Sequence, residues 1–198
     1  MSTQPHPSTR RTLRILVVTA LVGVLALGGL YGGWKARKAL MIRRALAVGL
    51  AAYDQGDWET ARLNLGRYIS VYPDDADVLA RYAYAQLSVR PVKPENLHQA
   101  IGAYRSVLRV RPDDDEAFRR LTLLYETTGN LGELSHIATR RLEVRPDDPA
   151  AIIAQAKDLI FREKRDAARA ALEGLVARLA EQPRECDDFV EACGLLVG

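Results

Sequence analysis

The chain has little of what metal sites, disulfide scaffolds and common active sites depend on. It contains 2 cysteines and 3 histidines in 198 residues, too few for a disulfide framework or a cysteine-rich zinc site. No histidine has a His, Cys, Asp or Glu partner four positions away, the spacing of helical metal motifs. It also lacks a glycine-rich phosphate loop and a nucleophile elbow. The sequence therefore predicts a protein that is not an enzyme and holds no metal or cofactor.

Acidic residues are missing from the first 44 positions, which carry 8 lysines and arginines. The other 154 residues hold 20 basic and 25 acidic groups, so the net charge of +3 arises in the N-terminal part alone. A protein that binds nucleic acid through its body needs a concentrated basic face. We therefore expect no nucleic-acid partner.

Charged residues are missing from 15–34, a run of 20 predominantly apolar positions. A helix of about 20 residues crosses the hydrocarbon core of a bilayer, so we expect a transmembrane helix over 15–34. A basic polar tail, 1–14, precedes it, and a basic juxtamembrane connector, 35–41, follows it. A cleavable signal peptide is the alternative, but its apolar region is usually only about 7–15 residues long. A retained anchor is the favoured interpretation.

The orientation of this helix and its self-association are two further expectations. The 14-residue tail carries three arginines and is costly to move across a membrane, which favours a body on the extracytoplasmic side. The basic residues that follow the helix favour the opposite orientation. Gly28 and Gly32 form a G-x-x-x-G pair, which permits close helix–helix contact and a homo-oligomer.

The tripeptide Pro-Asp-Asp recurs at 73–75, 112–114 and 146–148, each time after an apolar-periodic segment. Proline cannot continue the preceding helix, and the aspartates can cap the next helix and favour its N-terminal dipole. Paired catalytic carboxylates are the alternative, but the identical placement at three helix boundaries favours capping. The repeat predicts helical units that end at each of these prolines.

Upstream of these boundaries lie two helical patterns separated by a short break, such as Gln55-Gly56-Asp57-Trp58 in the first unit. This pattern resembles the tetratricopeptide repeat (TPR) family, whose unit is a helix–turn–helix of 34 residues. The resemblance implies an all-α solenoid over 42–182, with small residues where paired helices approach closely. The units would be 42–75, 76–114, 115–148 and 149–182, with the start of a fifth repeat or a partial cap over 183–198.

Three of the units depart from the TPR pattern. The second is five residues too long, and the excess falls in its turn around 89–94. The third has Thr122 and Leu134 at the two small positions, so its helix pair should be splayed. The fourth has Glu163 where the turn glycine is expected.

By the same resemblance, the first helices of the units line a concave groove that receives a protein or peptide partner. The candidate groove residues are mostly apolar and aromatic, and they are Leu46, Leu50, Tyr53, Tyr84, Leu87, Arg119 and Leu123. Leu46, Leu50 and Leu87 could instead simply pack against adjacent repeats. The two tyrosines are stronger candidates because aromatic side chains with a polar group are favoured at interfaces.

We therefore expect a membrane-anchored scaffold or adaptor that mediates protein–protein interaction at a membrane surface. The alternative is the N-terminal interaction or regulatory portion of a longer membrane-bound enzyme or transport component. It is suggested by the apolar segment at 192–198, since solenoids normally end in a polar-faced cap.

Overall fold

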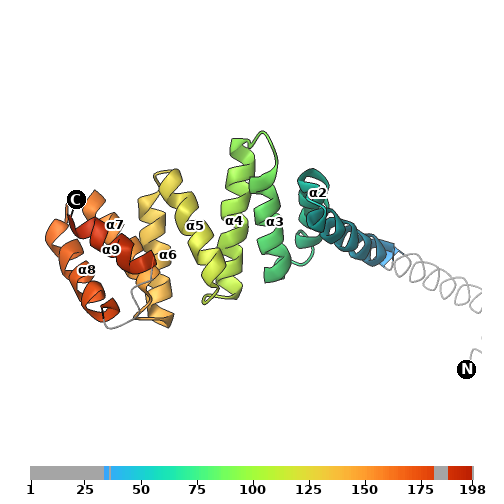
Figure 1. The fold of residues 1–198 in the computed structure, drawn as a ribbon. Coiled ribbons are helices and arrows are strands. Elements are labelled where there is room, and N and C mark those ends of the chain that lie inside the picture. Colours follow the sequence, from blue (N-terminus) through green and yellow to red (C-terminus); the bar gives the residue numbers. More distant parts are fainter. Residues whose placement is uncertain (1–33, 36, 181–186, 198) are drawn as a thin grey trace, which may run out of the picture.

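The computed structural model describes residues 34–35, 37–180 and 187–197, and their secondary structure consists of helices joined by turns (Figure 1). The helices follow one another as antiparallel pairs that stack side by side into a solenoid. In chain order they are a helix over 37–54, α2 (Trp58–Ile69), α3 (Ala76–Ser88), α4 (Pro94–Val110), α5 (Asp115–Thr127), α6 (Leu131–Val144), α7 (Pro149–Phe161), α8 (Arg165–Leu179) and α9 (Asp187–Val197).

The last residue of each Pro-Asp-Asp tripeptide caps the first helix of the next unit, which confirms the capping prediction. In all three cases the aspartate is the N-cap residue, and its carboxylate accepts a hydrogen bond from the backbone N–H three positions on. The bonds join Asp75 to Val78 at 3.2 Å, Asp114 to Ala117 at 2.9 Å, and Asp148 to Ala151 at 3.1 Å.

In the first, third and fourth units, one residue of the turn between the paired helices has a left-handed backbone conformation. Gly56 and Gly129 have φ of +75° and +70°, a left-handed conformation that glycine adopts without a steric penalty. Glu163 adopts the same conformation with φ of +61°, although it carries a side chain. The residue after each of them donates a backbone hydrogen bond across the turn, at 2.8–2.9 Å. The extra residues of the second unit lie at 89–93, between α3 and α4.

The close approach that the TPR resemblance implies between paired helices is present at Gly49, between helix 37–54 and α2. A Cβ atom at Gly49 would lie 2.7 Å from Cδ2 of Leu65 and 3.0 Å from its backbone nitrogen. The splayed pair expected in the third unit is also present, because α5 and α6 contact each other less extensively than α3 and α4 or α7 and α8. Leu134 fills the wider space between them and is fully buried.

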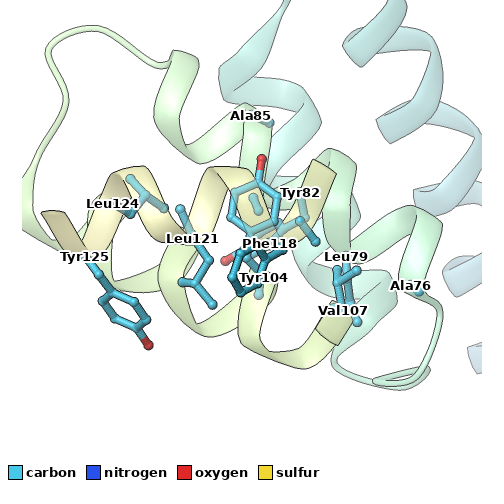
Figure 2. Packing of buried hydrophobic residues seen from close by; sticks show 14 of the residues in the cluster. Ala76, Leu79, Tyr82, Ala85, Tyr104, Val107, Phe118, Leu121, Leu124 and Tyr125 are labelled. Atoms are coloured by element: carbon cyan, nitrogen blue, oxygen red, sulfur yellow. The ribbon is translucent and has the colours of Figure 1, made fainter. Parts of the chain in front are cut away.

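The hydrophobic core runs along the solenoid in two parts. The larger cluster extends from helix 37–54 to the start of α7, and Figure 2 shows its centre, where Tyr82, Tyr104 and Phe118 from α3, α4 and α5 meet. The smaller cluster joins α7, α8 and α9 and contains Ile153 and Leu172. Each helix pair therefore buries its apolar face against its neighbours, as expected for a repeat protein.

Charged pairs connect the second helices of the units to the acidic boundary segments. Arg109 at the end of α4 binds Asp74 at 2.6 Å, and Arg111 binds Asp77 at 2.8 Å. In the third unit Arg141 is buried, binds Asp148 at 2.7 Å and also pairs with Asp115. Arg178 in the fourth unit pairs with Asp147 at the boundary that precedes this unit. The acidic boundary segments thus also anchor the second helices.

The predicted transmembrane helix over 15–34 lies outside the described residues except for Trp34. The tail 1–14 and the glycine pair Gly28 and Gly32 also lie outside them. In the part of the chain that the structure describes, no helix is both long enough and apolar enough to cross a membrane.

Candidate functional site

The candidate site is the surface formed by the first helices of the units: helix 37–54, α3, α5 and α7. We call this surface the first-helix face. Contacts between side chains join successive first helices, for example Tyr53 to Tyr84 and Lys157 to Glu126. The sequence analysis expects the partner groove on this face.

Three aromatic rings form a compact cluster at the N-terminal half of the first-helix face. Tyr53 lies at the end of helix 37–54, Tyr84 lies on α3, and Trp58 begins α2. The ring centroids of Tyr53 and Trp58 are 5.4 Å apart, those of Tyr53 and Tyr84 are 5.8 Å apart, and those of Trp58 and Tyr84 are 5.5 Å apart. All three pairs are edge-to-face, the arrangement that aromatic rings prefer. We call these three residues the aromatic cluster.

Two arginines from neighbouring first helices cover the tyrosines of the aromatic cluster. The guanidinium of Arg81 lies 5.5 Å from the ring of Tyr53, and that of Arg120 lies 5.6 Å from the ring of Tyr84. Both distances permit a cation–π interaction. Arg120 also binds Glu116 at 2.8 Å, so α5 contributes an oriented charge to the site. Burial is the main cause that raises the pKa of Tyr53 above its ordinary value, and the neighbouring Tyr84 adds to it.

Three of the four predicted leucines, Leu46, Leu50 and Leu87, are half-buried and pack against the larger core cluster. They support the repeats and still expose part of their side chains. The packing role that the sequence analysis left open is therefore present.

The other predicted residues occupy different positions on the first-helix face. Tyr53 and Tyr84 are brought together in the aromatic cluster. Leu123 on α5 is 57% exposed, and Arg119 is exposed and pairs with Glu116 on its own helix. Leu123 is thus an apolar group on the face that is available to a partner.

Sequence reasoning missed Trp58 and Arg120 as members of the site. Trp58 belongs to a second helix and reaches the face only because the tight turn at 55–57 brings the start of α2 beside the end of the preceding helix. Arg120 is the residue after Arg119, which was predicted for the groove, and was not itself predicted. The signal that could have found Trp58 is its place directly after the turn that begins with Gln55.

A three-helix charge cluster closes the C-terminal half of the first-helix face. Lys157 on α7 binds Glu126 on α5 at 2.6 Å and Glu191 on α9 at 2.5 Å. Burial alone would lower the pKa of Lys157, but hydrogen bonds to the two carboxylates outweigh it and raise the pKa above its usual range. This lysine therefore connects α5, α7 and α9, and the two carboxylates balance its positive charge.

The described residues contain no group of three or more His, Cys, Asp or Glu side chains placed to hold a metal ion. The first-helix face instead offers aromatic rings, aliphatic side chains and arginines. Such a surface can bind another polypeptide.

Comparison with known proteins identifies the fold. No protein-family model matches the chain, and no curated protein matches it. A crystal structure of MamA superposes with a TM-score of 0.50, at 15% identity over 78% of this chain and 77% of that one. The structure described as "Podosopora anserina putative kinesin light chain nearly identical TPR-like repeats" gives a TM-score of 0.50, at 13% identity over 78% of this chain and 82% of that one.

At these identities the likeness concerns the fold alone. The fold defines a class of helical-repeat protein, and the described part of this chain is an all-α arrangement of TPR-like repeats. The repeat fold expected from the sequence is thereby confirmed.

Proposed function

We propose that this chain is a membrane-anchored, TPR-like scaffold that binds a protein partner on its first-helix face and performs no catalysis itself. The observation that carries the proposal is the aromatic cluster with its two arginines. Tyr53, Trp58 and Tyr84 remain partly exposed, although aromatic side chains of this size gain most from full burial. Tyrosine, tryptophan and arginine are also the residues that contribute most to binding energy at protein interfaces.

The chemistry of the face defines the kind of segment that it would bind. The aromatic cluster and the half-buried leucines offer apolar contact, while Arg81 and Arg120 keep donors at the edge of the cluster. Leu123 extends the apolar surface along α5. A helical or extended segment with apolar anchors and nearby acceptors fits such a surface.

The membrane anchor is the second component of the proposal, and it is supported by the uncharged run at 15–34 in the amino-acid sequence. Holding the repeats at a membrane would raise the effective concentration of a partner there. We place the repeats on the extracytoplasmic side because the tail carries three arginines. We also propose self-association of the anchors through Gly28 and Gly32.

Partner binding is tested by expressing the tagged full chain in its own host, solubilising it gently and identifying co-purifying proteins by mass spectrometry. The test variants are Tyr53→Asp combined with Tyr84→Asp, and Leu123→Asp alone. Tyr72→Asp is the matched control, because Tyr72 is 46% exposed and packs against Tyr68 away from the aromatic cluster. A partner that is lost from both test variants and kept by the control supports the proposal.

Leu123→Asp keeps this test valid if the double variant fails to fold, because Leu123 is exposed and its replacement leaves no cavity. Circular dichroism of each variant establishes whether it is folded. A partner that co-purifies equally with all folded variants contradicts binding at the first-helix face.

Membrane anchoring is tested separately by alkaline extraction of membranes from the same cells. The full chain should stay in the membrane fraction, and a chain that begins at residue 42 should be released. Protease added to sealed cells or vesicles reports the side on which the repeats lie. Gly28→Ile combined with Gly32→Ile should reduce cross-linked dimers if the anchors associate through these glycines.

A further inference from the structure

A cleft between the second helices α4 and α6 lies outside the first-helix face. Its volume is about 150 Å³, of the order that accommodates a benzene-sized group. The apolar part of the lining comes from Leu108 on α4, Phe118 on α5, and Ile137 and Val144 on α6. Val144 is 55% exposed, so apolar surface reaches the mouth of the cleft. We call it the α4–α6 cleft.

Arginine side chains line both walls of the α4–α6 cleft, and a histidine lies on one of them. Arg105 and Arg109 come from α4, and His136 and Arg140 come from α6, whereas Glu143 is the acidic side chain in the lining. Arg105 binds Glu133 at 3.6 Å and Arg109 binds Asp74 at 2.6 Å, in each case through one terminal nitrogen. A guanidinium has five N–H donors, so both arginines keep donors for a further acceptor.

Among the arginines of this cleft, Arg140 is the one whose charge is not already paired with a carboxylate in the described part of the chain. It is exposed, and within the described residues it makes no hydrogen bond or ion pair with a carboxylate. Its neighbour Arg141, by contrast, is buried and held by Asp115 and Asp148. Only the first of these two arginines can therefore pair with a carboxylate from outside the chain.

The other units show that this charge is not a requirement of the fold. One repeat of 34 residues before His136 and Arg140 stand Gly102 and Ser106, and one repeat after them stand Ala170 and Gly174. Gly102 and Ser106 line the corresponding cleft between α2 and α4, which has no arginine in its lining. The α4–α6 cleft thus differs from its neighbour by its arginines, and one of them, Arg140, lies with His136 at positions that pack no core.

We propose that the α4–α6 cleft is a second docking site, for an acidic peptide segment that inserts one aliphatic side chain between α4 and α6. Charge complementarity selects this occupant. Carboxylates on either side of the inserted residue would bind Arg105 and Arg109 on one wall and Arg140 and His136 on the other. An anionic lipid headgroup would satisfy the cations but would leave the apolar floor without a partner.

The test uses the full chain in mild detergent and a fluorescein-labelled peptide of nine residues, with leucine at its centre, two glutamates on each side, and serine and glycine at the ends. Binding is followed by fluorescence anisotropy. The test variant combines His136→Ala with Arg140→Ser, the residues of the neighbouring units, so that folding is preserved. Arg67→Ser is the control, because Arg67 is an exposed arginine on α2 outside the cleft.

The native chain and the control variant should bind the peptide equally, and the test variant should bind it about tenfold more weakly, because charge-assisted hydrogen bonds are lost. Replacing the glutamates by glutamine, or the leucine by serine, should weaken binding by a similar factor. Equal binding of the test variant, equal binding of the glutamine peptide, or no saturable binding would overturn the proposal.

Vesicles of phosphatidylcholine with and without phosphatidylserine provide the second arm. If the His136→Ala and Arg140→Ser changes reduced binding to the anionic vesicles and left peptide binding unchanged, the cleft would be a lipid site and the peptide proposal would be wrong. The first-helix face takes no part in either arm. A failure here therefore leaves the proposed function standing, and a failure of the co-purification test leaves this proposal standing.

Discussion

The Nε atom of Arg141 donates a hydrogen bond of 2.7 Å to Oδ2 of Asp148, and both side chains are almost completely buried. Asp148 caps α7, so the pair ties the second helix of the third unit to the first helix of the fourth. The same guanidinium pairs with Asp115 at the preceding boundary and lies 4.6 Å from the ring of Phe118. One side chain therefore connects two successive Pro-Asp-Asp boundaries.

Replacing Arg141 by methionine should destabilise the chain by about 3 kcal/mol, because the buried carboxylate of Asp148 loses its closest cationic partner and keeps only the longer contact of 3.4 Å with Arg145. Arg145→Met is the matched control. Arg145 contacts the same two aspartates but is 43% exposed, so its loss should cost less than about 1 kcal/mol. Urea unfolding of the full chain in detergent, followed by circular dichroism, measures both. Equal costs would show that burial of the pair does not matter.

The turns of the third and fourth units provide a reciprocal pair of substitutions. Gly129→Ala should destabilise by about 1 kcal/mol through backbone strain alone, because a Cβ atom there meets nothing within 4 Å. Glu163→Gly should stabilise by about the same amount, since it relieves the same strain at φ of +61°. Unfolding midpoints in urea report the two signs. A Glu163→Gly variant of lower stability would contradict this account of the turn.

Gly49→Ala should destabilise by about 1–3 kcal/mol, because the added methyl group would overlap Leu65 on α2. Gly102→Ala is the control for a glycine inside a helix. It faces open space, so alanine there should stabilise by up to about 1 kcal/mol through its better helix propensity. Thermal unfolding of both variants measures the difference. If the two substitutions had the same effect, the close approach of the helices would be of no consequence.

The charge cluster around Lys157 predicts a pH dependence at alkaline pH. The folded pKa of Lys157 lies above the ordinary value of 10.5, so the folded chain holds this proton more tightly than the unfolded chain does. Its contribution to stability is complete below pH 10.5 and is lost as the pH rises through the folded pKa. Urea midpoints of the native chain should therefore fall more steeply above pH 10.5 than those of Lys157→Met. Parallel pH profiles would contradict the prediction.

Much of the fold could be predicted from the sequence because local chemistry determines it. Each Pro-Asp-Asp tripeptide stops one helix and caps the next by interactions within three residues, so the boundaries follow from single residues such as Asp114. Gly49 indicates a close helix contact because it occupies the small-residue position of the first helix in its repeat, which faces Leu65 on the second helix. Even the looser third unit follows from the size of Leu134.

The composition of the site was harder to predict because it depends on contacts between units. Tyr53 and Tyr84 could be proposed from their repeat positions, and the turn before Trp58 is a local signal for that ring, but nothing local places Arg120 over Tyr84. Arg141 is a charged residue, and a charged residue in a helix is expected on the solvent-exposed side. Its burial depends on the two aspartates that pair with it, Asp115 and Asp148, which lie on other segments. Long-range pairing of this kind has no signature in the spacing of residues along one helix.

Partner binding at the aromatic cluster is tested most directly by photo-cross-linking in the native host. A photoreactive phenylalanine analogue is placed at Tyr84 on the first-helix face and, as a control, at Tyr72 outside it. The account predicts a discrete covalent adduct with a second protein from position 84 and none from position 72. Adducts of the same protein from both positions, or from position 72 alone, would contradict binding at the first-helix face.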